Sequence, residues 1–460
     1  MSQSFVWKGS IIMKKAYIIS AVLAALVAAA MTACGNKQTS EPASQSSAAE
    51  TSVSATAETN ESEDTTEAAT SKAENKDSSA EIKQVSNTQS DLFTERDLEQ
   101  TADLSNAKTI KATDDKTVDI TEEGVYVISG SAENFTVRVD ADDTAKVQLV
   151  LDGVDIENDD FPVIYVISAD KVFVTTTDSD NTLTVSGQFT ADGETNTDAV
   201  IFSKDDLVLN GTGTLSIISN YGNGITGKDD MKITGGTYSV KCALDAFEAN
   251  DSISVCGGTF DIEADKDGFH CENDNAEGTV IISGGSFTIS AGSDGIQACA
   301  LLQTDGGDFD ITASEGLEAT NIVINDGNID IYASDDGINA TGDSADYEVA
   351  VTINGGNLNV EVGPGDTDAI DANGSVYING GTISITAQMS SFDYDRTAEF
   401  NGGTLIINGE EVSEIPQSMM MGGGHGGFGG GFGEPPTGDF GGEPPTGGFG
   451  GGRGGHGRMF

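Results

Sequence analysis

The sequence predicts an all-β protein: a parallel β-helix with three strands in each coil of about 22–25 residues, flanked by segments without regular structure. One observation is a repeated unit, apolar-x-apolar-x-Gly-Gly-Thr-apolar-x-Ile-x-Ala, whose second glycines lie 22, 27, 22, 20, 29, 25 and 22 residues apart. The other is a period of two within the unit, as in Phe260, Ile262 and Ala264, which is typical of half-buried strands. Strands alone in a repeat of this length indicate coils that stack on one another.

The first segment of the chain predicts secretion and attachment to a lipid. Met13-Lys14-Lys15 precedes an apolar run from Ala16 to Ala33, so residues 1–33 are assigned to a signal peptide with its true start at Met13. The run ends in Met31-Thr32-Ala33-Cys34-Gly35, which resembles the bacterial lipobox. We therefore expect Cys34 to be lipidated and the protein to be held on the outer face of the cytoplasmic membrane, in a Gram-positive type of envelope. An ordinary signal peptide with an incidental cysteine is the alternative.

Two further segments have compositions that do not support a packed core. Residues 34–90 consist mainly of Ser, Thr, Ala and Glu, and residues 419–460 are rich in glycine. Such segments bury too little apolar surface to offset the entropy lost on ordering. We expect a disordered tether and a disordered tail on either side of a β-helix domain over residues 95–415.

The charge and the cysteines limit the partners. The chain has 75 acidic and 22 basic residues, for a formal net charge of −53. This excess excludes nucleic acid, whose phosphates require a basic surface, and it suits metal cations or neutral polymers. Four cysteines remain besides Cys34, too few for a disulfide framework. The sequence leaves open a disulfide between Cys271 and Cys299, and we expect a monomer.

An acid or an amide recurs directly before the third strand of each repeat. We call these residues the acid row: Asp198, Asn223, Asp245, Asp267, Asp294, Glu315, Asp336 and Asp368. Carboxylates stacked about 5 Å apart repel one another by ~3 kcal/mol per pair at an effective dielectric constant of ~20. A cation would relieve this repulsion, and Ca²⁺ accepts carboxylate and carbonyl oxygens in flexible geometry. The acid row therefore predicts calcium, with the capping of backbone N–H groups by each acid as the alternative.

Two other sets of residues are candidates for a site. Asp206 and Asp230 lie in repeated Lys-Asp-Asp turns and are further candidate metal ligands. Three residues beyond members of the acid row lies an outward-facing set, the outer row, which consists of Glu248, His270, Gln297, Glu318, Asn339 and Asp371. Closely spaced carboxylates and amides suit the hydroxyl groups of a polymer, whereas a solvated surface is the alternative.

The combined motifs resemble a known family. Ser-Lys-Asp-Asp-Leu-x-Leu-Asn-Gly-Thr-Gly at 203–213, the Gly-Gly-Thr and Asp-Gly-Ile units, and Phe392-Asp393-Tyr394-Asp395 are similar to those of clostridial carbohydrate-binding lipoproteins. The resemblance covers about residues 95 to 415. It implies a right-handed parallel β-helix that carries calcium, is similar in fold to pectate lyases, and binds cellulose and pectic polysaccharide. Asn223 and Glu315 depart from the aspartate pattern of the acid row.

The distribution of basic residues favours binding over catalysis. A pectate lyase needs a basic residue to abstract a proton beside a carboxylate, yet this chain has no Lys or Arg from Asp267 to Asp395. We therefore expect a protein that binds a cellulose- or pectin-like polysaccharide and is not an enzyme. A calcium-dependent lyase or hydrolase on the same fold, and a surface scaffold or adhesin without a ligand, are the alternatives.

Overall fold

The computed structural model describes residues 92–273, 275, 277–342, 344–365 and 367–416. The predicted signal peptide, Cys34, the tether and the glycine-rich tail fall outside these ranges. Within them, none of the helices has the length and apolar character needed to cross a membrane. A 3₁₀ turn, η1 (Leu104–Asn106), precedes the strands.

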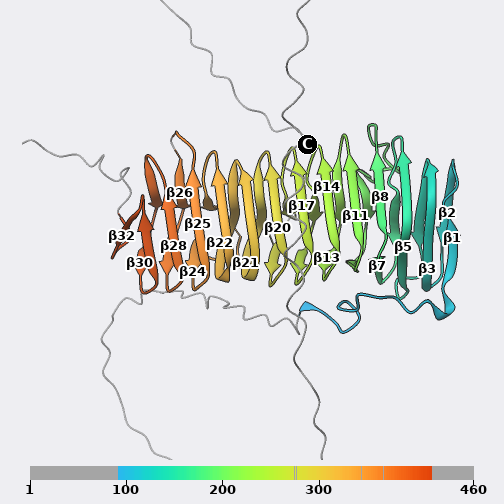
Figure 1. Ribbon diagram of the computed structural model, residues 1–460, viewed down its shortest axis with the longest axis horizontal. Coiled ribbons are helices and arrows are strands. Elements are labelled where there is room, and N and C mark those ends of the chain that lie inside the picture. Colours follow the sequence, from blue (N-terminus) through green and yellow to red (C-terminus); the bar gives the residue numbers. More distant parts are fainter. Residues whose placement is uncertain (1–91, 274, 276, 343, 366, 417–460) are drawn as a thin grey trace, which may run out of the picture. The chain divides into compact units, whose positions relative to one another are not determined.

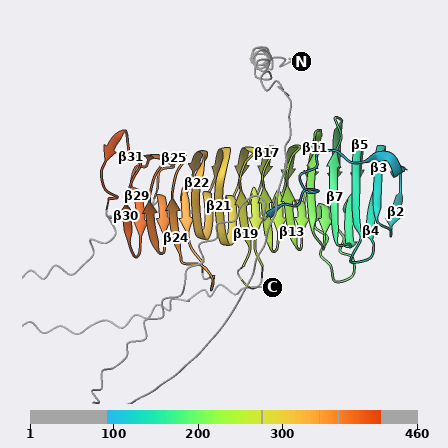
Figure 2. The ribbon, with the colours of Figure 1, turned by 90° about the horizontal axis from the view of Figure 1, so that it is seen from below.

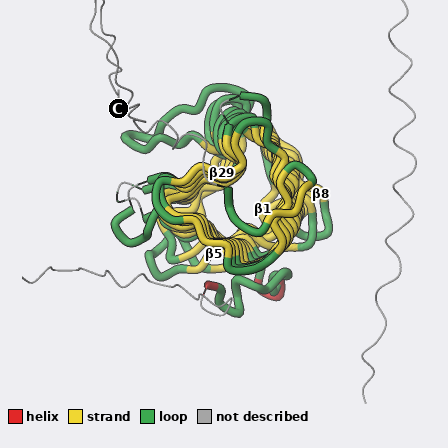
Figure 3. Tube along the Cα trace, turned by 90° about the vertical axis from the view of Figure 1, so that its left-hand side faces the viewer, coloured by secondary structure: helices red, strands yellow, loops and turns green. Residues whose placement is uncertain are grey.

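The described residues form the predicted parallel β-helix, because each coil adds one strand to each of three parallel sheets (Figures 1 and 3). The first sheet consists of β2 (Lys116–Ile120), β4 (Phe135–Asp140), β6 (Ile164–Ser168), β9 (Ala199–Ser203), β12 (Asn223–Gly227), β15 (Phe247–Ala249), β18 (Phe269–Cys271), the first parts of β21 (Asp294–Ala313) and β22 (Glu315–Ala333), β23 (Ile338–Ala340), β26 (Asp368–Ala372) and β29 (Ser390–Tyr394).

The second sheet consists of β1 (Lys108–Lys111), β3 (Gly124–Glu133), β5 (Lys146–Asn158), β7 (Lys171–Thr176), β10 (Leu207–Gly211), β13 (Asp230–Ile233), β16 (Ser252–Val255), β19 (Thr279–Ile282), the middle of β21 and β22, β24 (Ala350–Ile353), β27 (Ser375–Ile378) and β30 (Ala398–Phe400).

The third sheet continues from the ends of β3 and β5 through β8 (Asp180–Val185), β11 (Thr214–Ser219), β14 (Thr237–Cys242), β17 (Thr259–Ala264), β20 (Ser286–Ala291), the ends of β21 and β22, β25 (Asn357–Val362), β28 (Thr382–Thr386) and β31 (Thr404–Ile407). An antiparallel strand, β32 (Glu410–Val412), pairs with β31 and ends the stack.

The core is a column of equivalent side chains that stack from coil to coil. The rings of Phe260 and Phe287 lie 4.6 Å apart and nearly parallel, and those of Phe287 and Phe309 lie 4.5 Å apart. The Gly-Gly step makes room for this stack. Gly285 has a φ of +125°, and a Cβ on it would lie 3.0 Å from the Phe287 ring. A residue with a side chain would be strained there both by its backbone and by the ring.

The described segment before β1 lies along the outside of the second sheet, and we call residues 92–103 the strap (Figure 2). The Thr234 hydroxyl donates to the Asp97 carbonyl oxygen at 2.6 Å, and the Gly211 N–H donates to Gln100 Oε1 at 3.0 Å. The Asp97 carboxylate is fully buried and faces Lys171 Nζ at 3.5 Å. The strap thus binds coils that are more than a hundred residues later in the sequence.

The structure also shows whether Cys271 and Cys299 form a disulfide. Cys271 and Cys299 are both thiols, so the disulfide that the sequence left open is not formed. Cys271 is fully buried among apolar side chains of the core, and burial raises the pKa of its thiol above the usual range. It therefore acts as a small apolar core residue.

Candidate metal and ligand-binding face

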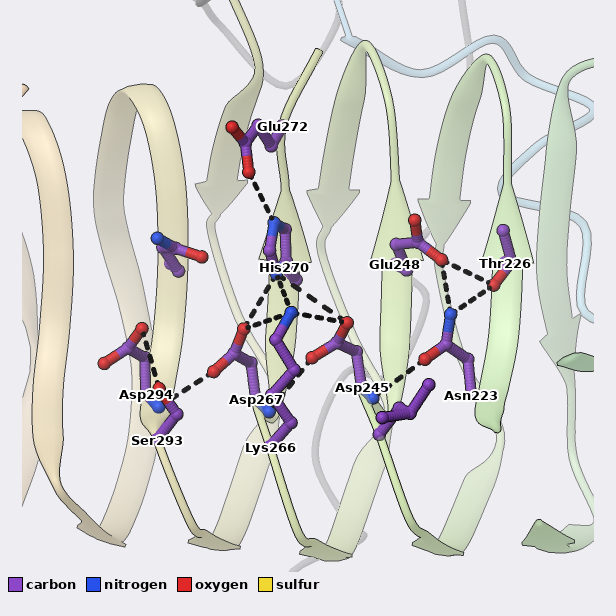
Figure 4. A network of polar contacts seen from close by, with 12 residues as sticks. Asn223, Thr226, Asp245, Glu248, Lys266, Asp267, His270, Glu272, Ser293 and Asp294 are labelled. Atoms are coloured by element: carbon purple, nitrogen blue, oxygen red, sulfur yellow. Dashed lines mark hydrogen bonds and ion pairs between the residues drawn. The ribbon is translucent and has the colours of Figure 1, made fainter. Parts of the chain in front are cut away.

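The acid row begins the strands of the first sheet, and its members hold one coil to the next. Asp245 Oδ1 accepts the Asp267 N–H at 3.1 Å, and Asp267 Oδ1 accepts the Asp294 N–H at 3.0 Å (Figure 4). Asp336 Oδ1 accepts the Asp368 N–H at 2.8 Å. Each of these three acids therefore caps the backbone of the following coil with one oxygen.

The register corrects one member of the acid row. Ile201 lies opposite Ile225, so Ala199, and not Asp198, lies opposite Asn223. Asp198 instead accepts a hydrogen bond from Asn223 N–H through its backbone carbonyl, at 2.7 Å. The offset arises because Ile201 follows Asp198 by three residues, whereas Ile225 follows Asn223 by two.

A lysine lies where two acids of the row approach each other. Lys266 Nζ is 3.1 Å from Asp245 Oδ2, 3.4 Å from Asp267 Oδ2 and 3.2 Å from His270 Nδ1. His270 Nδ1 is in turn 2.7 Å from Asp267 Oδ2. Asp245, Asp267 and His270 otherwise have ligand atoms close enough to share a metal ion. The ammonium of Lys266 thus supplies the positive charge at this step of the row.

The titration of this group follows from these contacts. Burial would raise the pKa of Asp267, but the hydrogen bonds from His270 and the Asp294 N–H, with the charge of Lys266, lower it to about 2. Burial would lower the pKa of His270, but its hydrogen bond to Asp267 raises the pKa on balance. The repeats did not predict this role of Lys266, although Lys266 immediately precedes an acid of the row.

In the preceding coil, the protein itself also balances the negative charge of Glu248. Lys228 Nζ lies 2.9 Å from Glu248 Oε1, and the Thr226 hydroxyl donates to Glu248 Oε2 at 2.8 Å. Asn223 donates to the same oxygen, and its own Oδ1 accepts the Asp245 N–H at 2.9 Å. Burial would raise the pKa of Glu248, but Lys228 and Thr226 lower it on balance. An amide at position 223 thus keeps the cap and adds no charge.

The next part of the row has a different character. Asp294, Glu315 and Glu318 each place a carboxylate oxygen within 4.8 Å of the others. Burial, followed by the charges of Asp267 and Glu318, raises the pKa of Asp294 to about 8. Burial likewise raises the pKa of Glu315 to about 7, despite a hydrogen bond from Asn339 Nδ2 at 2.8 Å. These carboxyl groups hold protons at a pH where ordinary carboxyl groups are ionised.

The same cluster suits a hard divalent cation. The Oδ1 atom of Asn339 is buried and accepts no hydrogen bond from any residue that the structure describes. Gln297 Nε2 donates to Glu318 Oε2 at 3.2 Å and so orients that carboxylate. Carboxylate and amide oxygens are the ligands that Ca²⁺ prefers. Asp294, Glu315, Glu318 and Asn339 are therefore the residues that could hold a calcium ion here.

The acidic character continues beyond this cluster. Burial and the charges of Asp368 and neighbouring acids raise the pKa of Asp336 to about 6, and burial with similar charges raises that of Asp371 to about 7. Asp393 lies opposite Asp371 on the next strand, which adds one acid to the outer row. The repeat pattern did not predict Asp393 as a site residue, because Ser390, and not an acid, begins its strand.

The two candidates from the Lys-Asp-Asp turns meet at the edge of the second sheet. Asp206, Asp229 and Asp230 have oxygens within 4.8 Å of one another, so Asp229 joins the predicted pair. Asp206 is 3.4 Å from Lys171 Nζ, and Asp230 accepts a hydrogen bond from the Ser252 hydroxyl at 2.6 Å. Burial and the surrounding carboxylates raise the pKa of Asp229 to about 6. Lysine already balances part of this cluster.

Comparison with known proteins agrees with the resemblance seen in the repeats. A family model described as carbohydrate-binding domain-containing protein matches residues 114–369 and 316–422. A curated protein with the same description from Acetivibrio thermocellus is 38% identical over 130 residues, which make up 28% of this chain and 46% of that protein. The chain therefore matches less than half of this relative's length.

Among solved structures, the polysaccharide lyase-like protein from C. thermocellum, in a gadolinium derivative, is similar to 68% of this chain and 99% of its own, at 25% identity and a TM-score of 0.34. The family match extends over more than half of the sequence and confirms the family that the repeats indicated. The chain belongs to the family of carbohydrate-binding domain-containing proteins.

Proposed function

We propose that this chain is a surface lipoprotein whose β-helix binds a polysaccharide without cleaving it, with calcium along the second part of the acid row. The observation that carries the proposal is the cluster of Asp294, Glu315 and Glu318, three half-buried or buried carboxylates that share one small volume. No Lys or Arg occurs in the sequence from Asp267 to Asp395, and among the described residues no Lys or Arg forms an ion pair with Asp294, Glu315 or Glu318. A cation would stabilise the ionised form of the cluster.

Calcium also gives this acidic protein a means to bind an acidic polymer. With a net charge of −53, the chain repels polygalacturonate unless a cation lies between the two sets of carboxylates. Of the outer row, Glu318 and Asn339 are themselves among the proposed calcium ligands, and Asp371 lies opposite Asn339 on the next strand. We place the bridging ions at these coils, and we assign Lys266 the corresponding role between Asp245 and Asp267.

The basic residues of this face support binding and not cleavage. Lys266 and His270 are each engaged by carboxylates, and a lysine held as a charged ion-pair partner is poorly suited to abstract a proton. Burial would lower the pKa of Lys266, but Asp245 and Asp267 raise it on balance, which keeps the ammonium protonated. A lyase or a hydrolase is the alternative function, and the release of cleavage products would reveal it.

The test is a sedimentation assay with insoluble cellulose and with polygalacturonate coupled covalently to beads, each in millimolar calcium and in chelator. We expect the full chain to bind polygalacturonate only with calcium and to bind cellulose in both buffers. Asp294→Asn with Glu318→Gln should weaken binding to polygalacturonate, whereas Asp261→Asn, an exposed acid on the third sheet, should not. If unsaturated products or new reducing ends appear, the function is catalysis and not binding alone. Retention of polygalacturonate binding in chelator would contradict the calcium bridge.

Anchoring makes a separate prediction. Replacement of Cys34 by Ala removes the only thiol at the end of the apolar run and should release the protein from the membrane fraction into the medium. The measurement is a comparison of membrane and medium fractions by immunoblot. A Cys299→Ala variant is the matched control and should stay with the membrane. If the Cys34→Ala protein stays in the membrane fraction, the lipid anchor is contradicted and an uncleaved signal segment is the anchor instead.

A further inference from the structure

A shallow groove lies on the outward surface of the third sheet, around strands β22, β25 and β28. Figure 1 labels these three strands. It has a volume of about 370 Å³ and is lined by Asn328, Asp330, Asn357, Asn359, Thr382 and Ser384. These are outward members of the period-two pattern, whereas Ile329 and Leu358 between them are buried in the core. The groove belongs to a different sheet from the acid row and to residues that the sequence analysis did not propose as a site.

The amides that line the groove are held in place by one another. Asn357 Nδ2 donates to Asn328 Oδ1 at 2.9 Å, and Asn328 Nδ2 donates to Asp308 Oδ1 at 2.7 Å. In parallel, Asn359 Nδ2 donates to Asp330 Oδ1 at 3.1 Å. A side-chain amide has two N–H donors, so each of these asparagines keeps a second donor for a ligand. Side chains that are already ordered lose less entropy when they bind.

An exposed aromatic residue, Tyr332, lies on the strand that supplies Asn328 and Asp330 to the groove. Tyr332 follows Asp330 by two residues on β22, so both point outward from the same strand. Tyr332 is 44% exposed, and among the aromatic residues that the structure describes only Tyr221 is more exposed, whereas the stacked Phe rings are buried. Thr312 and Glu361 lie opposite Tyr332 on the two neighbouring strands. A flat apolar ring therefore stands beside a set of ordered hydrogen-bonding groups.

We propose that this groove and Tyr332 form a binding site for an uncharged, hydroxyl-rich glycan chain that crosses the strands. Tyr332 stacks on a sugar ring, and the asparagines and Asp330 bind hydroxyl groups of successive sugars. Strands are spaced about 4.8 Å apart, so equivalent side chains recur at nearly the length of one pyranose unit. Asp308, Asp330 and Glu361 are exposed carboxylates around the groove and would repel an acidic polymer. The charge therefore selects a neutral glycan.

This inference rests on the proposed function, since it assigns the neutral-polymer mode to the third sheet and leaves the acidic-polymer mode to the acid row. The two surfaces require different conditions. Hydrogen bonding and stacking on the third sheet need no cation, whereas the bridge from the acid row needs calcium. Binding to a neutral glucan is therefore expected to persist in chelator as long as the protein is folded.

The test uses the full chain and cellohexaose, with calorimetry in chelator at a pH where the protein is folded. We expect Tyr332→Ala to bind roughly five- to tenfold more weakly, because an aromatic residue at the centre of a contact commonly carries such a share of affinity. Asn357→Ala with Asn359→Ala should weaken binding to a similar extent. Tyr221→Ala is the matched control, because Tyr221 is 55% exposed on the turn between β11 and β12 and should leave affinity unchanged.

The outcomes separate this site from the proposed function. Unchanged affinity in both groove variants, with cellohexaose bound by the wild type, would overturn the site and leave carbohydrate binding intact. Loss of cellohexaose binding in Asp294→Asn with Glu318→Gln, but not in Tyr332→Ala, would move the neutral glycan to the acid row. Failure of the wild type to bind any glycan would overturn both proposals. Thermal melts of each variant serve as the control for folding.

Discussion

In the presence of a chelator, the free energy of unfolding of the β-helix is expected to fall between about pH 4 and about pH 8. Asp294, Glu315 and Asp371 have pKa values near 8, 7 and 7, above the usual carboxyl range, so the folded chain retains protons that the unfolded chain releases. When the native state binds more protons, stability decreases as the pH rises. Each pKa unit corresponds to about 1.4 kcal/mol, so ionisation of these three carboxyl groups should lower the free energy of unfolding by several kcal/mol.

If calcium binds the ionised carboxylates as proposed, it should remove this dependence, because it would stabilise the state that repulsion disfavours. A ligand that binds only the native state at a hundred times its Kd adds about 2.7 kcal/mol. Melting temperatures measured from pH 4 to pH 8, with calcium and with chelator, should therefore diverge as the pH rises. Asp294→Asn with Glu318→Gln should flatten the curve in chelator, and Asp261→Asn should not. If the melting temperatures with calcium and with chelator follow parallel curves, the acids bind no calcium and serve only to cap backbone N–H groups.

The second large effect is expected at Lys266. Replacement by Met removes the ammonium that lies 3.1 Å from Asp245 Oδ2 and 3.4 Å from Asp267 Oδ2. Both carboxylates are buried, so the loss of their partner should lower stability in chelator by about 1–2 kcal/mol, a value reduced by the solvent that reaches the half-exposed lysine. The vacated position should then bind one additional calcium ion per chain, measured by calorimetry or by metal analysis after gel filtration.

Lys241→Met is the matched control for this experiment. Lys241 pairs with Glu263 on the third sheet, but both side chains are largely exposed, and exposed pairs contribute little to stability. It should change neither the melting temperature in chelator nor the number of calcium ions bound. An unchanged calcium stoichiometry in Lys266→Met would show that the lysine neutralises its neighbours without occupying a metal position.

The parts of the fold that follow from local periodicity could be predicted from the sequence. Phe260, Ile262 and Ala264 alternate with polar residues, and all three are buried in the core as that period requires. Asp294 and Glu315 lie opposite each other because both directly precede a glycine and an apolar residue in their repeats. The side chain of Lys266 escaped this reasoning, because no repeat tells which way a long flexible side chain turns.

Contacts between distant segments were equally hidden. The bonds of Gln100 and Asp97 to Thr234 join residues that share no repeat and no pattern. The groove around Asn357 escaped for another reason: polar residues on the outer surface of a strand are expected everywhere, and only their mutual hydrogen bonds distinguish these few. The one-residue offset at Asp198 depended on the register of a coil without the common motif.

The strap also decides how the β-helix carries a mechanical load. If Cys34 anchors the chain and a glycan holds the other side, tension reaches the described domain at residue 92. The first contacts to bear it are those of Arg96 over the Phe173 ring and of Asp97 with Lys171 and Thr234, which lie several coils away from β1. Among the described strands, the terminal strand β1 pairs with β3 alone and would be the easiest to peel away. Because the strap is fastened to inner coils, it relieves this end strand of force until its own contacts have failed.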